Sequence, residues 1–185
     1  TIKTRLNLEM APTEEMLKIA LKTMPDMVTI VPERREEVTT EGGLNVQKDT
    51  TKLVNVIKKL NSSGISTSIF IDPDAHQIKT CSEIGAKWIE IHTGSYASAK
   101  KEFILLELAK IKEAVVTAKS LGLNVNAGHG LTYQNVEPIA SIVSIEELNI
   151  GHTIISRALA VGLLQAVKEM KELIKNPRLD LFSYS

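Results

Sequence analysis

Short apolar runs alternate with longer stretches of helical periodicity along the whole chain. Six runs, rich in β-branched or apolar residues and bounded by turn residues, predict strands over residues 5–10, 27–33, 66–72, 88–94, 124–130 and 147–152. The stretches between them predict helices over residues 13–23, 49–62, 74–84, 97–121, 132–142 and 153–175. Strict alternation with short links implies parallel strands joined by right-handed crossovers.

Polar residues stand near the carboxyl end of nearly every predicted strand. Alternation places Asn7 with Glu9, and Glu90 with His92, on the same face of the sheet, while the apolar neighbours face the helices. An open doubly wound sheet gathers polar groups at one switch point, whereas a barrel brings all its strand ends to one mouth. The pattern therefore favours an α/β fold of the (β/α)₈ TIM-barrel type with a ligand-binding interior.

Six βα units are two short of a closed barrel. Such barrels typically need roughly 200–250 residues, and this chain has 185. We expect residues 1–185 to form a single domain made of six of the eight units. The first two units are then absent from this sequence or supplied by another chain. The start at Thr1, without an initiator Met, also indicates a cut.

Composition narrows the class of protein. Lys plus Arg and Asp plus Glu are equal at 22 each, so no basic surface for nucleic acid or membranes is expected. The single cysteine, Cys81, is typical of a reducing cytoplasm, and we interpret it as a small buried filler. No apolar run is long enough for a membrane span and no signal peptide is visible.

The segment 124–132 carries the most specific chemical pattern. A strand runs into Gly128, His129 and Gly130 and then into a helix. The glycines permit close approach to a ligand, the opening helix can hold a phosphate, and His129 can transfer protons. The alternative is a strand-end turn whose histidine only caps backbone groups.

Two further strand ends carry candidate residues. Gly151 and His152 open the last predicted helix, where such barrels commonly bind phosphate, although a generic glycine turn is the alternative. Glu90 stands one pleat before His92 and could orient it or raise its pKa, or the two could form a structural hydrogen bond.

Glu9 ends an otherwise apolar strand. An enclosed carboxylate there can act as general acid or base, and a salt bridge to a neighbouring strand is the alternative. The polar loop 32–43 suits a substrate-binding loop or lid, or a solvated surface. His76 is interpreted as a surface residue.

Six strings together resemble the pyridoxine 5′-phosphate synthase family. They are LNLEMA (6–11), VPERREEVTTEGGL (31–44), FIDPD (70–74), IEIHTGSYA (89–97), LNVNAGHGLTYQNV (123–136) and ELNIGH (147–152). The resemblance implies condensation of 3-amino-2-oxopropyl phosphate with 1-deoxy-D-xylulose 5-phosphate to pyridoxine 5′-phosphate, phosphate and water. It also implies a cytoplasmic enzyme that acts on small phosphorylated substrates as a homo-oligomer, an octamer, without metal or redox cofactor.

The resemblance also implies roles for individual residues. Glu9 resembles the acid/base carboxylate, His129 the proton donor and Glu90 a stabilising carboxylate. The implied contacts to the amino-oxopropyl phosphate are Gly130, Gly151 and His152, and the implied contact to the sugar phosphate is Thr39. The family's first two strands carry an Asn, an Asp-His pair, arginines and a catalytic histidine that have no match here.

Two rival interpretations stay open. Another phosphosugar barrel enzyme could use Glu9, Glu90, His92 and His129 as metal ligands. Alternatively, a chain lacking two strands could be an inactive partner or fragment. A Schiff-base aldolase is disfavoured because Lys87 stands at the wrong end of its strand.

Overall fold

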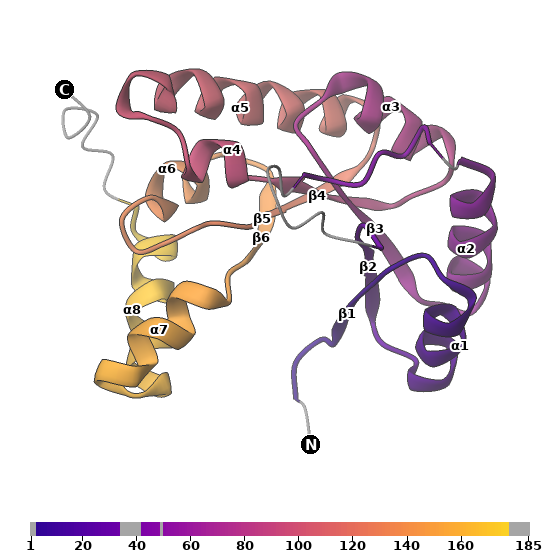
Figure 1. Ribbon diagram of the computed structural model, residues 1–185, viewed down its shortest axis with the longest axis horizontal. Helices are drawn as coiled ribbons and strands as arrows, with labels where there is room; N and C mark the ends of the chain where they lie inside the picture. The colour runs from indigo at the N-terminus through magenta and orange to yellow at the C-terminus, as the bar shows by residue number, and fades with distance from the viewer. Residues whose placement is uncertain (1–2, 34–41, 49, 178–185) are drawn as a thin grey trace.

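The computed structural model describes residues 3–33, 42–48 and 50–177. Six parallel strands form one sheet in the order in which they occur in the sequence. They are β1 (Asn7–Met10), β2 (Met27–Ile30), β3 (Ser66–Ile71), β4 (Trp88–His92), β5 (Asn124–Gly128) and β6 (Ile145–Asn149). The sheet curls into a half-barrel whose edges are β1 and β6 (Figure 1). This α/β architecture is consistent with a TIM-barrel-like fold.

Helices lie around the outer side of the curled sheet (Figure 1). They are α1 (Glu14–Thr23), α2 (Thr50–Ser62), α3 (Ala75–Glu83), the short α4 (Gly94–Ala97), α5 (Ile104–Ser120), α6 (Val136–Ala140), α7 (His152–Val161) and α8 (Leu163–Lys175). A 3₁₀ turn at Lys101–Phe103 precedes α5. In the part of the chain that the structure describes, no helix combines the length and apolar character needed to cross a bilayer.

Local sequence signals explain where several helices begin and end. The Thr13 hydroxyl accepts the Met16 N–H at 3.2 Å at the start of α1, which satisfies one of the unpaired donors of the first turn. Asp74 does the same for α3 by accepting the Gln77 N–H at 2.9 Å. After α3, Gly85 has φ 84°, a left-handed conformation that costs glycine little. The predicted glycine stop at this helix is confirmed.

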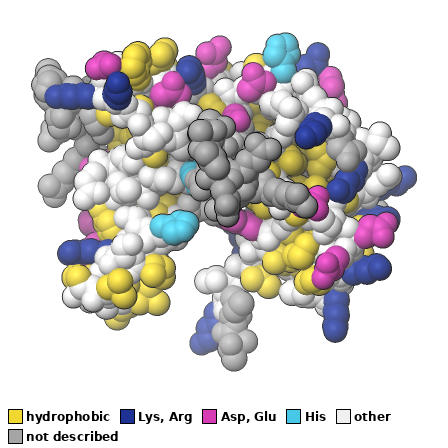
Figure 2. Space-filling model, in the orientation of Figure 1, with side chains coloured by type: hydrophobic (Ala, Val, Ile, Leu, Met, Phe, Trp, Pro, Cys, Tyr) yellow, Lys and Arg dark blue, Asp and Glu magenta, His cyan; other side chains and the backbone are white. Residues whose placement is uncertain are grey.

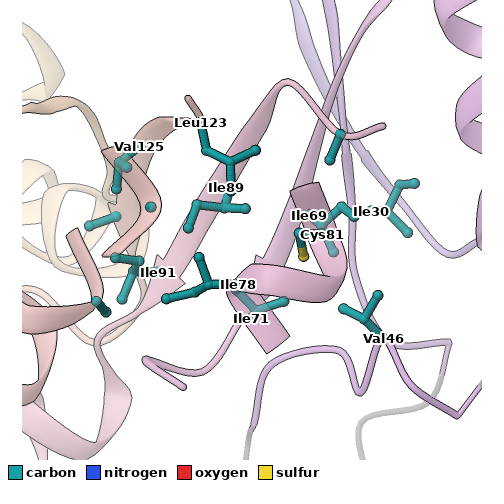
Figure 3. Close-up of a cluster of buried hydrophobic side chains, with 14 of the residues drawn as sticks. Ile30, Val46, Ile69, Ile71, Ile78, Cys81, Ile89, Ile91, Leu123 and Val125 are labelled. Atoms are coloured by element: carbon teal, nitrogen blue, oxygen red, sulfur yellow. The ribbon is translucent and has the colours of Figure 1, made fainter. Parts of the chain in front are cut away.

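An apolar core lies between the outer face of the sheet and the helices (Figure 3). Ile69, Ile89, Ile91 and Val125 are fully buried there. Cys81 of α3 packs in the same cluster, and burial raises the pKa of its thiol to about 12. A thiol held in this form is a poor nucleophile, so its interpretation as a buried filler is confirmed.

Two predicted long helices are wrong as single elements. The prediction over 97–121 fails because Lys100 is extended, with ψ 152°, and separates α4 from the 3₁₀ turn and α5. The prediction over 153–175 fails because Gly162 takes φ 83° and ψ 151°, which ends α7 and starts α8. Periodicity runs through both breaks because the flanking helices each present an apolar face.

Smaller boundary predictions also differ. The helix expected over 132–142 is reduced to α6, because Asn135 Oδ1 accepts the Thr132 N–H at 2.6 Å and holds the preceding residues in a turn. The last strand begins at Ile145, two residues before the prediction. Strands β2 to β6 end one to three residues before the prediction, so Glu33, Asp72 and His129 lie in the connecting loops and His152 begins α7.

Candidate functional site

The inner face of the half-barrel is polar. Thr29, Ser68, Glu90, His92 and Asn126 point to this face and are all buried. The register places Glu90 between Phe70 of β3 and Asn126 of β5. The alternation predicted for β4 and β5 is therefore confirmed. Both amide atoms of Asn126 and the hydroxyl of Ser68 have no partner among the described residues.

Glu90 is the most perturbed acid of this face. Its side chain is 3% exposed, and one carboxyl oxygen accepts a hydrogen bond from Asn149 Nδ2 of β6 at 2.6 Å. Burial raises the pKa of Glu90 to about 7; the Asn149 hydrogen bond opposes that rise and the charge of Glu9 adds to it. Glu90 can therefore hold or release a proton near neutral pH.

Glu9 lies on the edge strand β1 and is exposed to solvent. Its register partner is Thr29 of β2, which is on the inner face. Glu9 therefore occupies the same face of the sheet as Thr29 and Glu90, and its charge adds to the rise in the pKa of Glu90. The enclosure expected for Glu9 is wrong for this open edge.

His129 follows β5 in a constrained turn. Its φ is 81°, a conformation uncommon for a residue with a side chain. The Thr93 hydroxyl donates to the carbonyls of Gly128 and His129, at 2.8 and 2.5 Å, and fixes this turn. Gly128 is required because a β-carbon there would lie 2.4 Å from Glu90 Oε1. The Glu90 carboxyl therefore lies against Gly128, the residue that precedes His129.

The predicted pairing of Glu90 with His92 is wrong. His92 Nδ1 instead lies 2.9 Å from Asp72 Oδ1, in the segment after β3, and this hydrogen bond holds the pKa of Asp72 below its ordinary value. Residues two apart on a strand share a face but are separated by a full pleat, whereas the adjacent parallel strand brings Asp72 alongside. The available signal was the place of Asp72 in the middle of FIDPD, directly after the strand that neighbours the strand of His92.

The predicted phosphate contacts lie at two loop ends. Gly151 and His152 are exposed at the start of α7, three residues or fewer after Asn149. No side chain caps this helix, in contrast to α1 and α3, so its first N–H groups can bind an anion. Gly130 has φ 73°, and a β-carbon there would lie 2.7 Å from that of Ala97.

Thr39, the predicted contact to the sugar phosphate, lies outside the described residues, as do positions 34–41 of the predicted loop. The described end of that loop reaches the site. The Gly43 N–H donates to Asp72 Oδ1 at 3.0 Å, and a β-carbon at Gly43 would lie 2.3 Å from the backbone nitrogen of Asp72. The chain therefore returns from this loop directly beside the Asp72–His92 pair.

Other sequence interpretations can be placed on the structure. His76 is exposed on α3, as predicted. Arg5 pairs with Glu147 of β6, and Lys87 is exposed just before β4. Within residues 3–33, 42–48 and 50–177, no three His, Cys, Asp or Glu side chains group closely enough to hold a metal ion.

Comparison with known proteins identifies the family. The sequence model of the pyridoxal phosphate biosynthesis protein PdxJ matches residues 1–176. The chain belongs to the PdxJ family. A relative named pyridoxine 5′-phosphate synthase, from Prochlorococcus marinus strain NATL2A, is 64% identical over 182 residues, which cover 98% of this chain and 74% of the relative. One of the same name from Synechococcus sp. strain CC9311 is 60% identical over 180 residues, with 97% and 72% covered.

Solved structures support the fold of this PdxJ chain. The 4-hydroxy-tetrahydrodipicolinate synthase of Methylacidiphilum fumariolicum SolV superimposes with a TM-score of 0.55 at 12% identity, covering 89% of this chain and 59% of that chain. The BexX/CysO complex of Amycolatopsis orientalis gives a TM-score of 0.51 at 15% identity, with 88% and 63% covered. At such identities the likeness concerns the fold alone.

Proposed function

We propose that this protein is a pyridoxine 5′-phosphate synthase that condenses 3-amino-2-oxopropyl phosphate with 1-deoxy-D-xylulose 5-phosphate. The observation that carries the proposal is that the chain belongs to the PdxJ family. It is supported by the positions of Glu9 and Glu90 on strands β1 and β4 of one sheet and of His129 just after β5. Pyridoxine 5′-phosphate, phosphate and water are the products. Imine formation, phosphate loss and ring closure all need proton transfers, which these groups can supply.

Each of the three groups suits a different proton transfer. Glu9 is exposed to solvent, so its carboxylate can reach the bound substrate and act as the general base that removes a proton from carbon or nitrogen. His129 can donate a proton to an oxygen that leaves as water. Glu90, with a pKa near 7, can lie beside a cationic imine as a carboxylate and accept its proton when the charge is lost.

The amino-oxopropyl phosphate is placed at the start of α7. The uncapped N–H groups after Gly151 and the imidazole of His152 can hold a dianion, and the helix dipole favours it. Gly130 adds a second backbone approach on the loop after the neighbouring strand β5. Thr39 is proposed to contact the sugar phosphate on the strength of the resemblance alone.

We also propose that residues 1–185 form one domain that is completed to a closed (β/α)₈ barrel by two further βα units between β6 and β1. Both edge strands pair with one neighbour only, and an open parallel edge exposes unpaired backbone groups. Figure 2 shows apolar side chains gathered over α7 and α8, where the exposed residues are Ile155, Leu159, Leu163 and Leu164. Further protein on this side would cover them. Assembly as a homo-octamer in the cytoplasm is proposed from the resemblance.

Product formation tests the function. The 185-residue chain is assayed with both phosphates, in parallel with a version that adds the quarter of the Prochlorococcus relative lying outside the match. Pyridoxine 5′-phosphate and released phosphate are measured in equal amounts. We expect turnover in the longer version, and activity in neither version would refute the enzyme. Dialysis against a chelator separates the metal-dependent rival, since a loss of activity that metal restores would favour it.

A further inference from the structure

His129 is packed against two other rings rather than standing alone at the mouth. The ring centroids of His92 and His129 lie 4.8 Å apart with an interplanar angle of 57°. Phe70 meets His92 edge-on at 5.1 Å and lies 6.3 Å from His129. The orientation of the His129 ring therefore depends on how firmly His92 is held.

Asp72 determines which nitrogen of His92 carries the proton. The low pKa of Asp72, caused first by its hydrogen bond with His92, keeps the carboxylate ionised at neutral pH. An ionised carboxylate only accepts hydrogen bonds, so His92 Nδ1 must donate across the 2.9 Å contact. In the neutral ring, Nε2 is then left as an acceptor.

The Nε2 atom of His92 is buried and lacks a partner among the described residues. Gly94 makes room for it, because a β-carbon at this position would lie 2.4 Å from Nε2 and 3.2 Å from His129 Cδ2. The acceptor and the edge of the His129 ring thus converge on the same backbone position. An unsatisfied buried acceptor destabilises the fold, and this one lies at the wall of the site.

We propose that Asp72 and His92 are positioning residues for His129. The carboxylate fixes His92 as the Nδ1–H tautomer, and the ring so held keeps His129 turned toward the mouth. This inference rests on the proposed function, since it deepens the donor role of His129.

A double-mutant cycle tests whether the pair acts as a unit. Asp72→Ala, His92→Phe and the double variant are compared in the version of the protein that turns over both phosphates. Phenylalanine preserves the ring contacts of His92 while removing both nitrogens. Each single change is expected to lower kcat roughly 10- to 100-fold, the range found for carboxylates that orient functional histidines, with KM changed less than threefold. The double variant should be no slower than the slower single variant.

Two control variants separate the effect of losing the Asp72 charge from the general effect of removing a carboxylate from the surface. Glu83→Gln removes an exposed carboxylate of the neighbouring helix α3 that pairs only weakly with Lys79, and it should leave kcat unchanged. Asp72→Asn retains an acceptor for the Gly43 N–H but not the charge, and its kcat should fall between wild type and Asp72→Ala. Losses that multiply in the double variant, or a change confined to KM, would overturn the proposal.

Nuclear magnetic resonance gives a readout that does not depend on turnover. ¹⁵N shifts of the His92 ring should report the Nδ1–H tautomer in the wild-type protein and a mixture in Asp72→Ala. A nuclear Overhauser contact between His129 Hδ2 and Gly94 Hα should weaken in Asp72→Ala. The proposal would be contradicted by an Nε2–H tautomer of His92 in the wild type, or by a His129–Gly94 contact that is unaltered in Asp72→Ala. If no version forms product while both signals behave as expected, the proposed function fails and the positioning of His129 stands.

Discussion

The two faces of the curled sheet differ in what they contribute. The outer face presents Ile69, Ile89 and Val125, whose side chains are apolar and fully buried against the helices. The inner face buries Glu90 and Asn126 to the same degree but leaves several polar atoms without partners. Burying apolar surface stabilises the fold, whereas burying unsatisfied polar groups destabilises it. Stability thus resides on the outer face and chemistry on the inner face.

The largest effect is expected at His129 on the inner side of the sheet, where a substitution should lower activity without lowering the free energy of unfolding. His129→Asn removes the imidazole but suits the left-handed backbone, because asparagine tolerates a positive φ. We expect kcat/KM to fall about 10²–10⁴-fold, the usual contribution of a proton donor, while the free energy of unfolding changes by less than about 1 kcal/mol. Steady-state assays and urea denaturation measure the two. His76→Asn, on the exposed side of α3, is the matched control, and an equal loss in both variants would contradict the assignment.

A truncation on the outer face should do the opposite. Ile89→Ala opens a cavity in the core and should lower the free energy of unfolding by about 2–5 kcal/mol. Urea denaturation measures it, with Val143→Ala as control, since Val143 is 85% exposed and its truncation should cost no more than about 0.5 kcal/mol. The kcat of the folded fraction should stay near that of the wild type. An Ile89→Ala variant that kept full stability but lost activity would contradict the assignment of stability to the outer face and activity to the inner face.

The pH dependence of stability should report the cost of burying Glu90. Its pKa rises on folding from 4.5 to about 7. Below pH 4.5 Glu90 is protonated in both the folded and the unfolded state and does not affect stability. Between pH 4.5 and pH 7 it loses its proton in the unfolded state first, so the folded state becomes progressively less stable. Above pH 7 this destabilisation is complete. Glu90→Gln removes it and can still accept from Asn149. The variant should therefore gain up to about 3 kcal/mol above pH 7 and nothing at pH 4, while kcat falls.

Measurements of the free energy of unfolding from pH 4 to pH 9 test this. A constant difference between Glu90→Gln and the wild type across that range would contradict the buried carboxyl as its source. Gain of stability with loss of activity is the expected signature of an inner-face residue.

The smallest effect is expected at the exposed ion pair between Arg5, which precedes β1, and Glu147 of β6. Arg5 and Glu147 pair with side chains that are 61% and 32% exposed, so solvent screens their attraction. Arg5→Gln should lower the free energy of unfolding by about 0.2–1 kcal/mol, and by less in high salt. Thermal denaturation at low and high ionic strength measures it. A loss of several kcal/mol would mean that this pair holds the curvature of the open sheet.

The sequence predicted the alternation of faces more reliably than the ends of elements. Glu90 and His92 were placed inward because a strand repeats every two residues, and no tertiary contact can change that without disrupting the register. Helix ends were less certain because periodicity continues past a break. Gly162 interrupts a seemingly continuous helix only because its backbone adopts φ 83°.

The candidate site shows the same difference between features that the sequence predicts and features that depend on the tertiary structure. Glu9, Glu90 and His129 were chosen from the sequence because they stand near strand ends, and the structure places the Glu90 carboxyl against Gly128, next to His129 in the chain. Asp72 was noticed as a strand end but not as the partner of His92. The choice of partner depends on which strand lies alongside and on how far each side chain reaches, and the spacing along the chain carries neither.

The sequence by itself therefore determined the order of the elements, the face on which each strand residue lies and the family to which the chain belongs. Local geometry and residue chemistry suffice for these, because they act over a few positions. Only the tertiary structure decided the partners: Asp72 with His92, Asn149 with Glu90, and the ring of His92 beside His129. Contacts between distant segments follow from how strands align and helices pack, and this alignment is a property of the whole fold.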